Sequence, residues 1–214
     1  MNMPATINDR SKEILEVITK NWDNYTTFLE KGGVPTALAM YLGTREMPSA
    51  PASTRSDLVG SYVGGLVELS LRTMVYMVKL ATVYNLGAEL PRSSIIKIGL
   101  LHDIGKLGTP DGEPYYIESK DEWRRNKLGE NFSINPDLQH MSVPTLTTMW
   151  LNKFNVELTA NELHAVHSLG NHPGVFDRND APNKTETWAS VVLQQSVKAA
   201  ILKGRGQRFP SLVS

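Results

Sequence analysis

An adjacent histidine and aspartate, His102 and Asp103, are the residues of this chain best suited to chemistry. They close an apolar run that begins at Ile95, and a run of this kind predicts a buried helix. A buried carboxylate is costly unless it is paired or bound to a cation. Because imidazole nitrogen and carboxylate oxygen together suit zinc, iron or manganese, the pair predicts a divalent-metal site.

Two residues just after the pair extend this prediction. Gly105 is expected to let the backbone turn, and Lys106 is expected to lie at the mouth of a pocket. An ammonium group in that position is suited to binding a phosphate.

The histidines are unevenly distributed, because all five lie between positions 102 and 172. Any one of these histidines could have a structural role or be exposed to solvent, but their grouping favours a catalytic or metal-binding site. His164 and His167 are three residues apart and share a helix face, with His164 on its solvent side. His172 lies in a bend from which a side chain can reach back towards a core, and His140 directly precedes a helix.

The composition limits the class of protein. A chain of 214 residues is long enough for one domain with a sizeable core. Lys plus Arg and Asp plus Glu number 22 each, which argues against a strong, non-specific polyanion binder. The chain has no cysteine, so a metal must be bound by histidines and carboxylates. We expect no signal peptide, no membrane association and a cytoplasmic location.

Helical spacing of apolar residues dominates the chain, and no segment indicates a strand pair. The expected fold is all-α, a compact helical bundle. We divide it into an N-terminal helical extension (1–46), a main domain (47–203) and a short basic tail (204–214). Helix ends are expected at Gly32, at Gly87, near Ser142, at the Thr159 capping box and near Thr187.

A strongly polar segment, residues 118–127, has two interpretations. Charge runs usually form a solvated surface helix. The alternative is a lid over the pocket, with Arg124 or Arg125 meeting a phosphate.

Taken together, these motifs resemble the HD-domain superfamily of metal-dependent phosphohydrolases, nearest to a subgroup common in tailed-phage genomes. The resemblance covers roughly residues 50 to 203. The matching segments, in the order of the family, are 51–54, 64–71, 101–106, 115–116, 121–123, 127–129, 135–140, 158–174 and 192–200.

The resemblance implies a set of site residues. The implied metal ligands are His102, Asp103, His140 and His172, and the implied catalytic residues are Asp103 and Lys106. Four residues are candidates for substrate binding: Lys106, Arg124, Arg125 and His167.

Three positions depart from the family pattern. Leu69 stands where the first metal-binding histidine is expected, after Gly-Gly-Leu-x-Glu. Val197 stands where the last aspartate ligand is expected, and Asp57 replaces a further histidine. The resemblance therefore implies a reduced site that holds one metal.

Two functions remain open at this point. The first is a phosphohydrolase that acts on a nucleotide or nucleic-acid phosphoester with one divalent cation (zinc, manganese, iron or magnesium). The second is a catalytically inactive protein of the same fold that binds no metal and instead binds a nucleotide or a partner protein, for instance a host factor. The location is then the host-cell cytoplasm if the chain is phage-encoded. The oligomeric state stays open.

Overall fold

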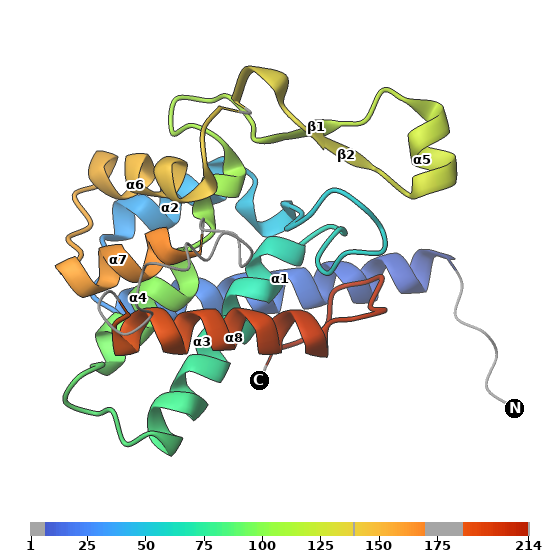
Figure 1. Ribbon diagram of the computed structural model, residues 1–214. Coiled ribbons are helices and arrows are strands. Elements are labelled where there is room, and N and C mark those ends of the chain that lie inside the picture. The colour runs from blue at the N-terminus through green and yellow to red at the C-terminus, as the bar shows by residue number, and fades with distance from the viewer. Residues whose placement is uncertain (1–6, 139, 170–185, 214) are drawn as a thin grey trace, which may run out of the picture.

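The computed structural model describes residues 7–138, 140–169 and 186–213, and in these the chain is mostly helical (Figure 1). No helix among the described residues is long and apolar enough to cross a membrane. The α-helices are α1 (Ile7–Lys31), α2 (Thr36–Thr44), α3 (Gly65–Val83), α4 (Arg92–Leu101), α5 (Glu122–Leu128), α6 (Val143–Lys153), α7 (Ala160–Ser168) and α8 (Trp188–Lys203). Short 3-10 turns cover η1 (Met47–Ser49), η2 (Ile104–Leu107) and η3 (Pro136–Leu138).

Helix α3 is the centre of the bundle, and it packs against α4, α8 and α1 (Figure 1). Its first two turns are buried on every side, from Gly65 to Leu71. A stretch of helix that is buried on every side has no solvent face, so neighbouring elements must cover it. The expected helical bundle is therefore confirmed at the level of the all-α class.

Several helix ends follow the sequence signals. Ser142 caps α6, and both Thr159 and Thr187 form capping boxes at the starts of α7 and α8. The end of α3 differs from expectation, because Asn85 and not Gly87 takes the left-handed conformation, with φ 55°. Asparagine tolerates this region, so it serves as the helix terminator here.

A small antiparallel ribbon corrects the expectation that the chain has no strand pair. Strand β1 (Tyr116–Glu118) pairs with β2 (Phe132–Ile134), and α5 lies between them in sequence. We call residues 116–134 the hairpin lobe; Figure 1 shows it projecting from one end of the bundle. The lobe is joined to residues 52–57 by backbone hydrogen bonds, such as that from the Ser56 amide to the Gly129 carbonyl at 2.8 Å.

The segment after α8 is held against the bundle by a buried carboxylate, that of Glu68 in α3. The Ser211 amide and hydroxyl donate to the two carboxylate oxygens at 2.9 Å each, and the Gln207 side chain donates at 2.8 Å. Arg72 forms an ion pair with the same carboxylate, and the Tyr62 hydroxyl donates to it at 3.1 Å. The short basic tail is thus docked on its own chain.

Candidate functional site

His102 is the buried residue around which the candidate site forms. It caps the C-terminal end of α4 and is 1% exposed. Its Nδ1 atom lies 3.0 Å from the Gly99 carbonyl oxygen, which can only accept a hydrogen bond. Nδ1 therefore carries the proton, and Nε2 is left with a bare lone pair.

The Nε2 atom of His102 has no hydrogen-bond partner among the described residues, although it is fully buried. Burial lowers the pKa of this imidazole below its ordinary value, in spite of the opposing influence of Asp103. A neutral ring at pH 7, with an unpaired Nε2 lone pair and a carbonyl-bound Nδ1–H, is the arrangement that metal-ligating histidines adopt.

Asp103 lies beside this lone pair, with Oδ2 3.6 Å from His102 Nε2. The Lys106 ammonium donates to the same oxygen at 2.6 Å. Burial acts to raise the pKa of Asp103, but the charge and hydrogen bond of the Lys106 ammonium outweigh it, and the net pKa is lowered. Burial likewise acts to lower the pKa of Lys106, and Asp103 outweighs it, so the net pKa is raised. The pair is therefore ionised at neutral pH.

Helix α6 fixes the geometry of this turn through Thr147, a residue that sequence analysis missed. Its hydroxyl donates to the His102 carbonyl oxygen at 3.1 Å and accepts from the Gly105 amide at 3.0 Å. Gly105 lies in the 3-10 turn η2 that follows α4, as expected of a turn residue, although its φ is not positive. A Cβ there would lie 2.3 Å from the Val143 carbonyl oxygen, and glycine is needed for close packing on α6. The available signal in the sequence was a threonine directly after Leu146, on a helix whose other face is apolar.

The remaining residues of the implied site lie elsewhere or outside the described residues. His140 is exposed to solvent. His167 is also exposed, and its Nε2 atom lies 3.0 Å from the Thr148 hydroxyl. His172 lies outside the described residues. Arg124 on α5 forms an ion pair with Glu130 at 2.8 Å. Arg125 lines a separate cleft, which contains none of His102, Asp103 and Lys106.

Leu69 and Val197 both pack in or against the apolar core. Leu69 on α3 is 6% exposed, and Val197 on α8 is half-buried against the same apolar cluster. Helices α3 and α8 pack directly on each other. Both side chains therefore contribute to the apolar core.

The described residues fit a divalent cation only in part. Two donors that each lie about 2.1 Å from one cation are at most about 4.2 Å apart, and the 3.6 Å between His102 Nε2 and Asp103 Oδ2 satisfies this. No group of three or more His, Asp or Glu side chains suited to a metal occurs within residues 7–138, 140–169 and 186–213. The described site thus offers two protein ligands.

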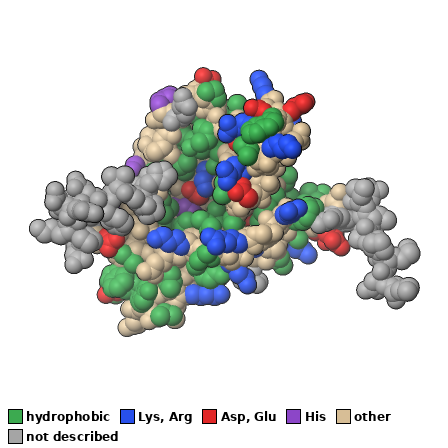
Figure 2. All heavy atoms as spheres, turned by 45° about the vertical axis from the view of Figure 1, so that its right-hand side comes forward, with side chains coloured by type: hydrophobic (Ala, Val, Ile, Leu, Met, Phe, Trp, Pro, Cys, Tyr) green, Lys and Arg blue, Asp and Glu red, His purple; other side chains and the backbone are tan. Residues whose placement is uncertain are grey.

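The pair is accessible from solvent, because the side chains of Asp103 and Lys106 are 14% and 17% exposed. The face in Figure 2 is hollowed between the hairpin lobe and the helices, and acidic, basic and histidine side chains gather in that hollow. Burial also raises the pKa values of Tyr115 and Tyr116, whose hydroxyls lie within the electrostatic reach of Lys106. This site combines a lone-pair nitrogen, a carboxylate and an ammonium group.

Comparisons of this chain with protein-family models, with curated proteins and with solved structures find no match.

Proposed function

We propose that this chain is an HD-type phosphohydrolase that uses one divalent cation and acts on a nucleotide or nucleic-acid phosphoester. The observation that carries the proposal is the buried Nε2 lone pair of His102, 3.6 Å from the Asp103 carboxylate and without a hydrogen-bond partner in the described part of the chain. A buried polar atom of this kind costs free energy unless a ligand satisfies it. The order of motifs that resembles the HD superfamily supports the same assignment.

The residues present divide the chemistry between them. His102 and Asp103 would hold the cation, and a cation held there supplies Lewis acidity towards a phosphoryl oxygen and towards water. Lys106 is close enough to pair with an anionic substrate in place of Asp103, and it would balance the charge that develops on the phosphoryl group. The Gly99 carbonyl keeps the His102 ring in one tautomer and one orientation.

A second candidate function rests on the core positions of Leu69 and Val197. Both residues are apolar and packed where the resemblance implies metal ligands. An apolar core in that place favours a protein that has lost metal chemistry and binds a nucleotide or a partner protein with the same scaffold. Activity measurements separate the two candidates.

The test is hydrolysis of a phosphodiester, bis(p-nitrophenyl) phosphate, and of a nucleotide panel with added zinc, manganese, iron or magnesium. We expect hydrolysis by the wild type, none by Asp103→Ala, and a loss of about 10²-fold or more in kcat for Lys106→Met. Glu122→Gln, an exposed change on α5, is the matched control and should retain full activity. Hydrolysis that persists in Asp103→Ala contradicts the proposal, and the absence of hydrolysis with every metal favours the binding function.

A further inference from the structure

A cleft of about 470 Å³ lies between the hairpin lobe and the docked tail, apart from the His102 site. Its lining comes from four parts of the chain: α1, the loop before α3, the hairpin lobe and the tail. The lining residues are Ile14, Ser61, Tyr62, Val63, Glu118, Arg125, Asn131, Phe132, Arg208, Phe209 and Pro210. This volume is within the range of small-molecule sites in proteins.

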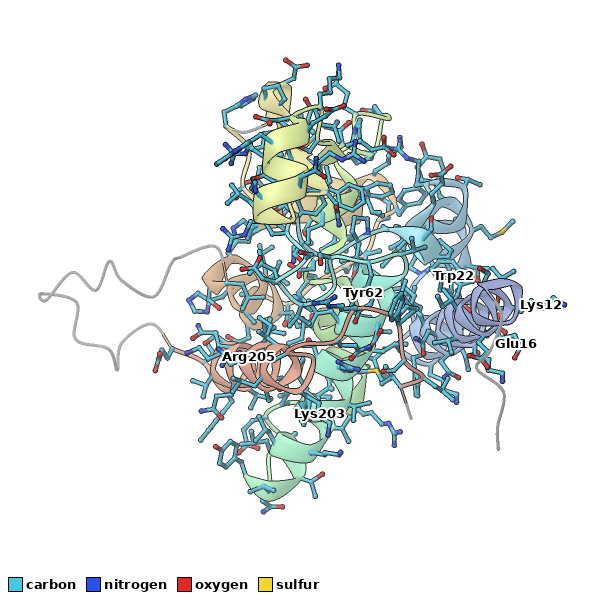
Figure 3. The ribbon with its side chains drawn as sticks, turned by 90° about the vertical axis from the view of Figure 1, so that its right-hand side faces the viewer. Lys12, Glu16, Trp22, Tyr62, Lys203 and Arg205 are labelled. Carbon is cyan, nitrogen blue, oxygen red and sulfur yellow. The ribbon has the colours of Figure 1, made fainter. Side chains whose placement is uncertain are left out.

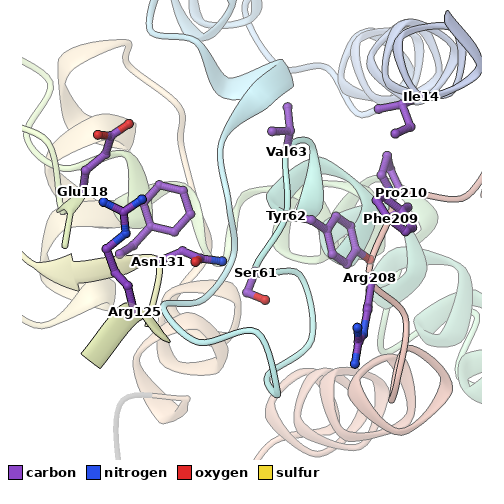
Figure 4. A pocket seen from close by; sticks show the side chains of 11 residues that line it. Ile14, Ser61, Tyr62, Val63, Glu118, Arg125, Asn131, Arg208, Phe209 and Pro210 are labelled. Carbon is purple, nitrogen blue, oxygen red and sulfur yellow. The ribbon is translucent and has the colours of Figure 1, made fainter. Parts of the chain in front are cut away.

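Two arginines give the cleft a positive balance. Figure 4 shows Arg125 entering from the side of the hairpin lobe and Arg208 from the tail, with Ser61 between them. Neither guanidinium has a hydrogen bond or an ion pair within the described residues, whereas Arg124, the neighbour of Arg125, is paired with Glu130. Glu118 is the single acidic residue of the lining, so the formal charge of the lining is positive. The two guanidinium groups lie on opposite sides of the cleft in Figure 4, and unpaired guanidinium groups that flank a cavity favour an anionic ligand.

The walls of the cleft are aromatic and apolar. Tyr62 and Phe209 lie together on the side of α1 and the tail in Figure 4, and Phe132 comes from β2. Flat rings of this kind provide stacking surfaces for a flat ligand ring. The Ser61 hydroxyl and the side-chain amide of Asn131 form no hydrogen bond with other described residues, so they remain available to a polar ligand edge.

The wall formed by the tail is rigidly positioned before any ligand binds. The hydroxyl of Tyr62 donates to Glu68, and burial raises the pKa of this phenol, which remains neutral. Gln207 and Ser211, on either side of residues 208–210, are bound to the same carboxylate. In Figure 3, Tyr62 lies between the α5 lobe and α8, next to this segment. A preorganised wall lowers the entropic cost of binding.

From these features we infer that the cleft is a binding site for a nucleoside monophosphate or a closely similar phosphorylated aromatic compound. The exposed side chains of Arg125 and Arg208 turn inward from opposite sides of the cleft to pair with the phosphate, and the ring packs on the aromatic wall. The inference goes beyond the proposed phosphohydrolase function, because the cleft contains none of His102, Asp103 and Lys106.

Isothermal titration of the full chain with AMP and GMP tests this inference. We expect Arg125→Gln and Arg208→Gln each to weaken binding at least tenfold, because a charge-assisted hydrogen bond is lost. Arg205→Gln, a tail arginine outside the lining, is the matched control and should bind as the wild type does. Phe132→Leu should weaken AMP binding about tenfold through loss of stacking.

Two further titrations test whether the ligand needs an aromatic ring and whether the cleft is independent of the His102 site. Ribose 5-phosphate, which lacks the aromatic ring, should bind at least tenfold more weakly than AMP. In EDTA, which keeps a divalent cation from the His102 site, Asp103→Ala should retain wild-type AMP affinity, so that a failure of the phosphohydrolase proposal leaves this result intact. The inference is overturned by no binding of AMP or GMP at about 1 mM, by ribose 5-phosphate binding as tightly as AMP, or by unchanged affinity in the Arg125→Gln Arg208→Gln double variant.

Discussion

Glu68 holds the tail against the bundle, and its replacement by glutamine should weaken the whole fold. Its carboxylate is 1% exposed and accepts hydrogen bonds from Tyr62, Gln207 and Ser211, in addition to its ion pair with Arg72. Each carboxylate oxygen faces at least two donors. The glutamine side chain would place its NH₂ group against hydrogen-bond donors that now face a carboxylate oxygen. It would also leave Arg72 without its negatively charged partner.

The size of the loss in unfolding free energy depends on the hydrogen bonds that Arg72 keeps when its ion pair with Glu68 is removed. Removing one partner of a buried ion pair costs about 3–5 kcal/mol. Arg72 also donates to the Gln207 side chain at 2.6 Å and to the Ser211 hydroxyl at 2.7 Å, so the lower end applies. We expect the free energy of unfolding to fall by about 3 kcal/mol, and Tm to fall by roughly 6–12 °C for a chain of this size.

Thermal unfolding followed by circular dichroism measures this change, and limited trypsin digestion shows whether the tail is released. Cleavage at Arg205 and Arg208 should be faster in Glu68→Gln than in the wild type, as seen by mass spectrometry. The exposed substitution Glu122→Gln should leave both measurements unchanged. A Glu68→Gln protein that melts within about 2 °C of the wild type and keeps its tail intact would refute the reasoning.

Three other predictions concern the site itself. Gly105→Ala should lower the free energy of unfolding by about 1–3 kcal/mol in chemical denaturation, because its Cβ meets the α6 backbone; an unchanged midpoint would count against the close packing. The pKa of Asp103 is lowered in the folded state, so the ionised Asp103–Lys106 pair stabilises the fold above about pH 4 and loses this effect as the pH falls. The difference in free energy of unfolding between the wild type and Asp103→Asn should therefore narrow in acid. A difference that stays constant with pH would contradict the pairing. The double variant Leu69→His Val197→Asp should bind zinc more tightly than the wild type in titrations; unchanged affinity would reject the alignment of these two positions with metal ligands.

Local signals in the sequence account for much of the helical fold. The caps at Ser142, Thr159 and Thr187 depend on residues three positions apart, and such short-range patterns are readable from one chain. The hairpin lobe was not predicted, because strands of three residues, Tyr116–Glu118 and Phe132–Ile134, are too short to show a period of two.

Long-range partners lay beyond the reach of sequence patterns. Glu68 was read as part of a family motif, but its partner Ser211 lies 143 positions away. The His102–Asp103–Lys106 cluster was predicted together, since neighbours on one helix end remain neighbours in space. The assignment of His140 to the same site depended on resemblance alone, and it remains a prediction.

Metal content is the most direct test of the proposed site at His102 and Asp103. The measurement is elemental analysis of the untagged chain, purified without chelator and incubated with zinc or manganese before gel filtration. The account predicts about one metal ion per chain in the wild type and in the exposed-histidine control His164→Ala, and none in Asp103→Ala or His102→Ala. A wild type without metal, or an Asp103→Ala protein that retains its full metal content, would contradict the account.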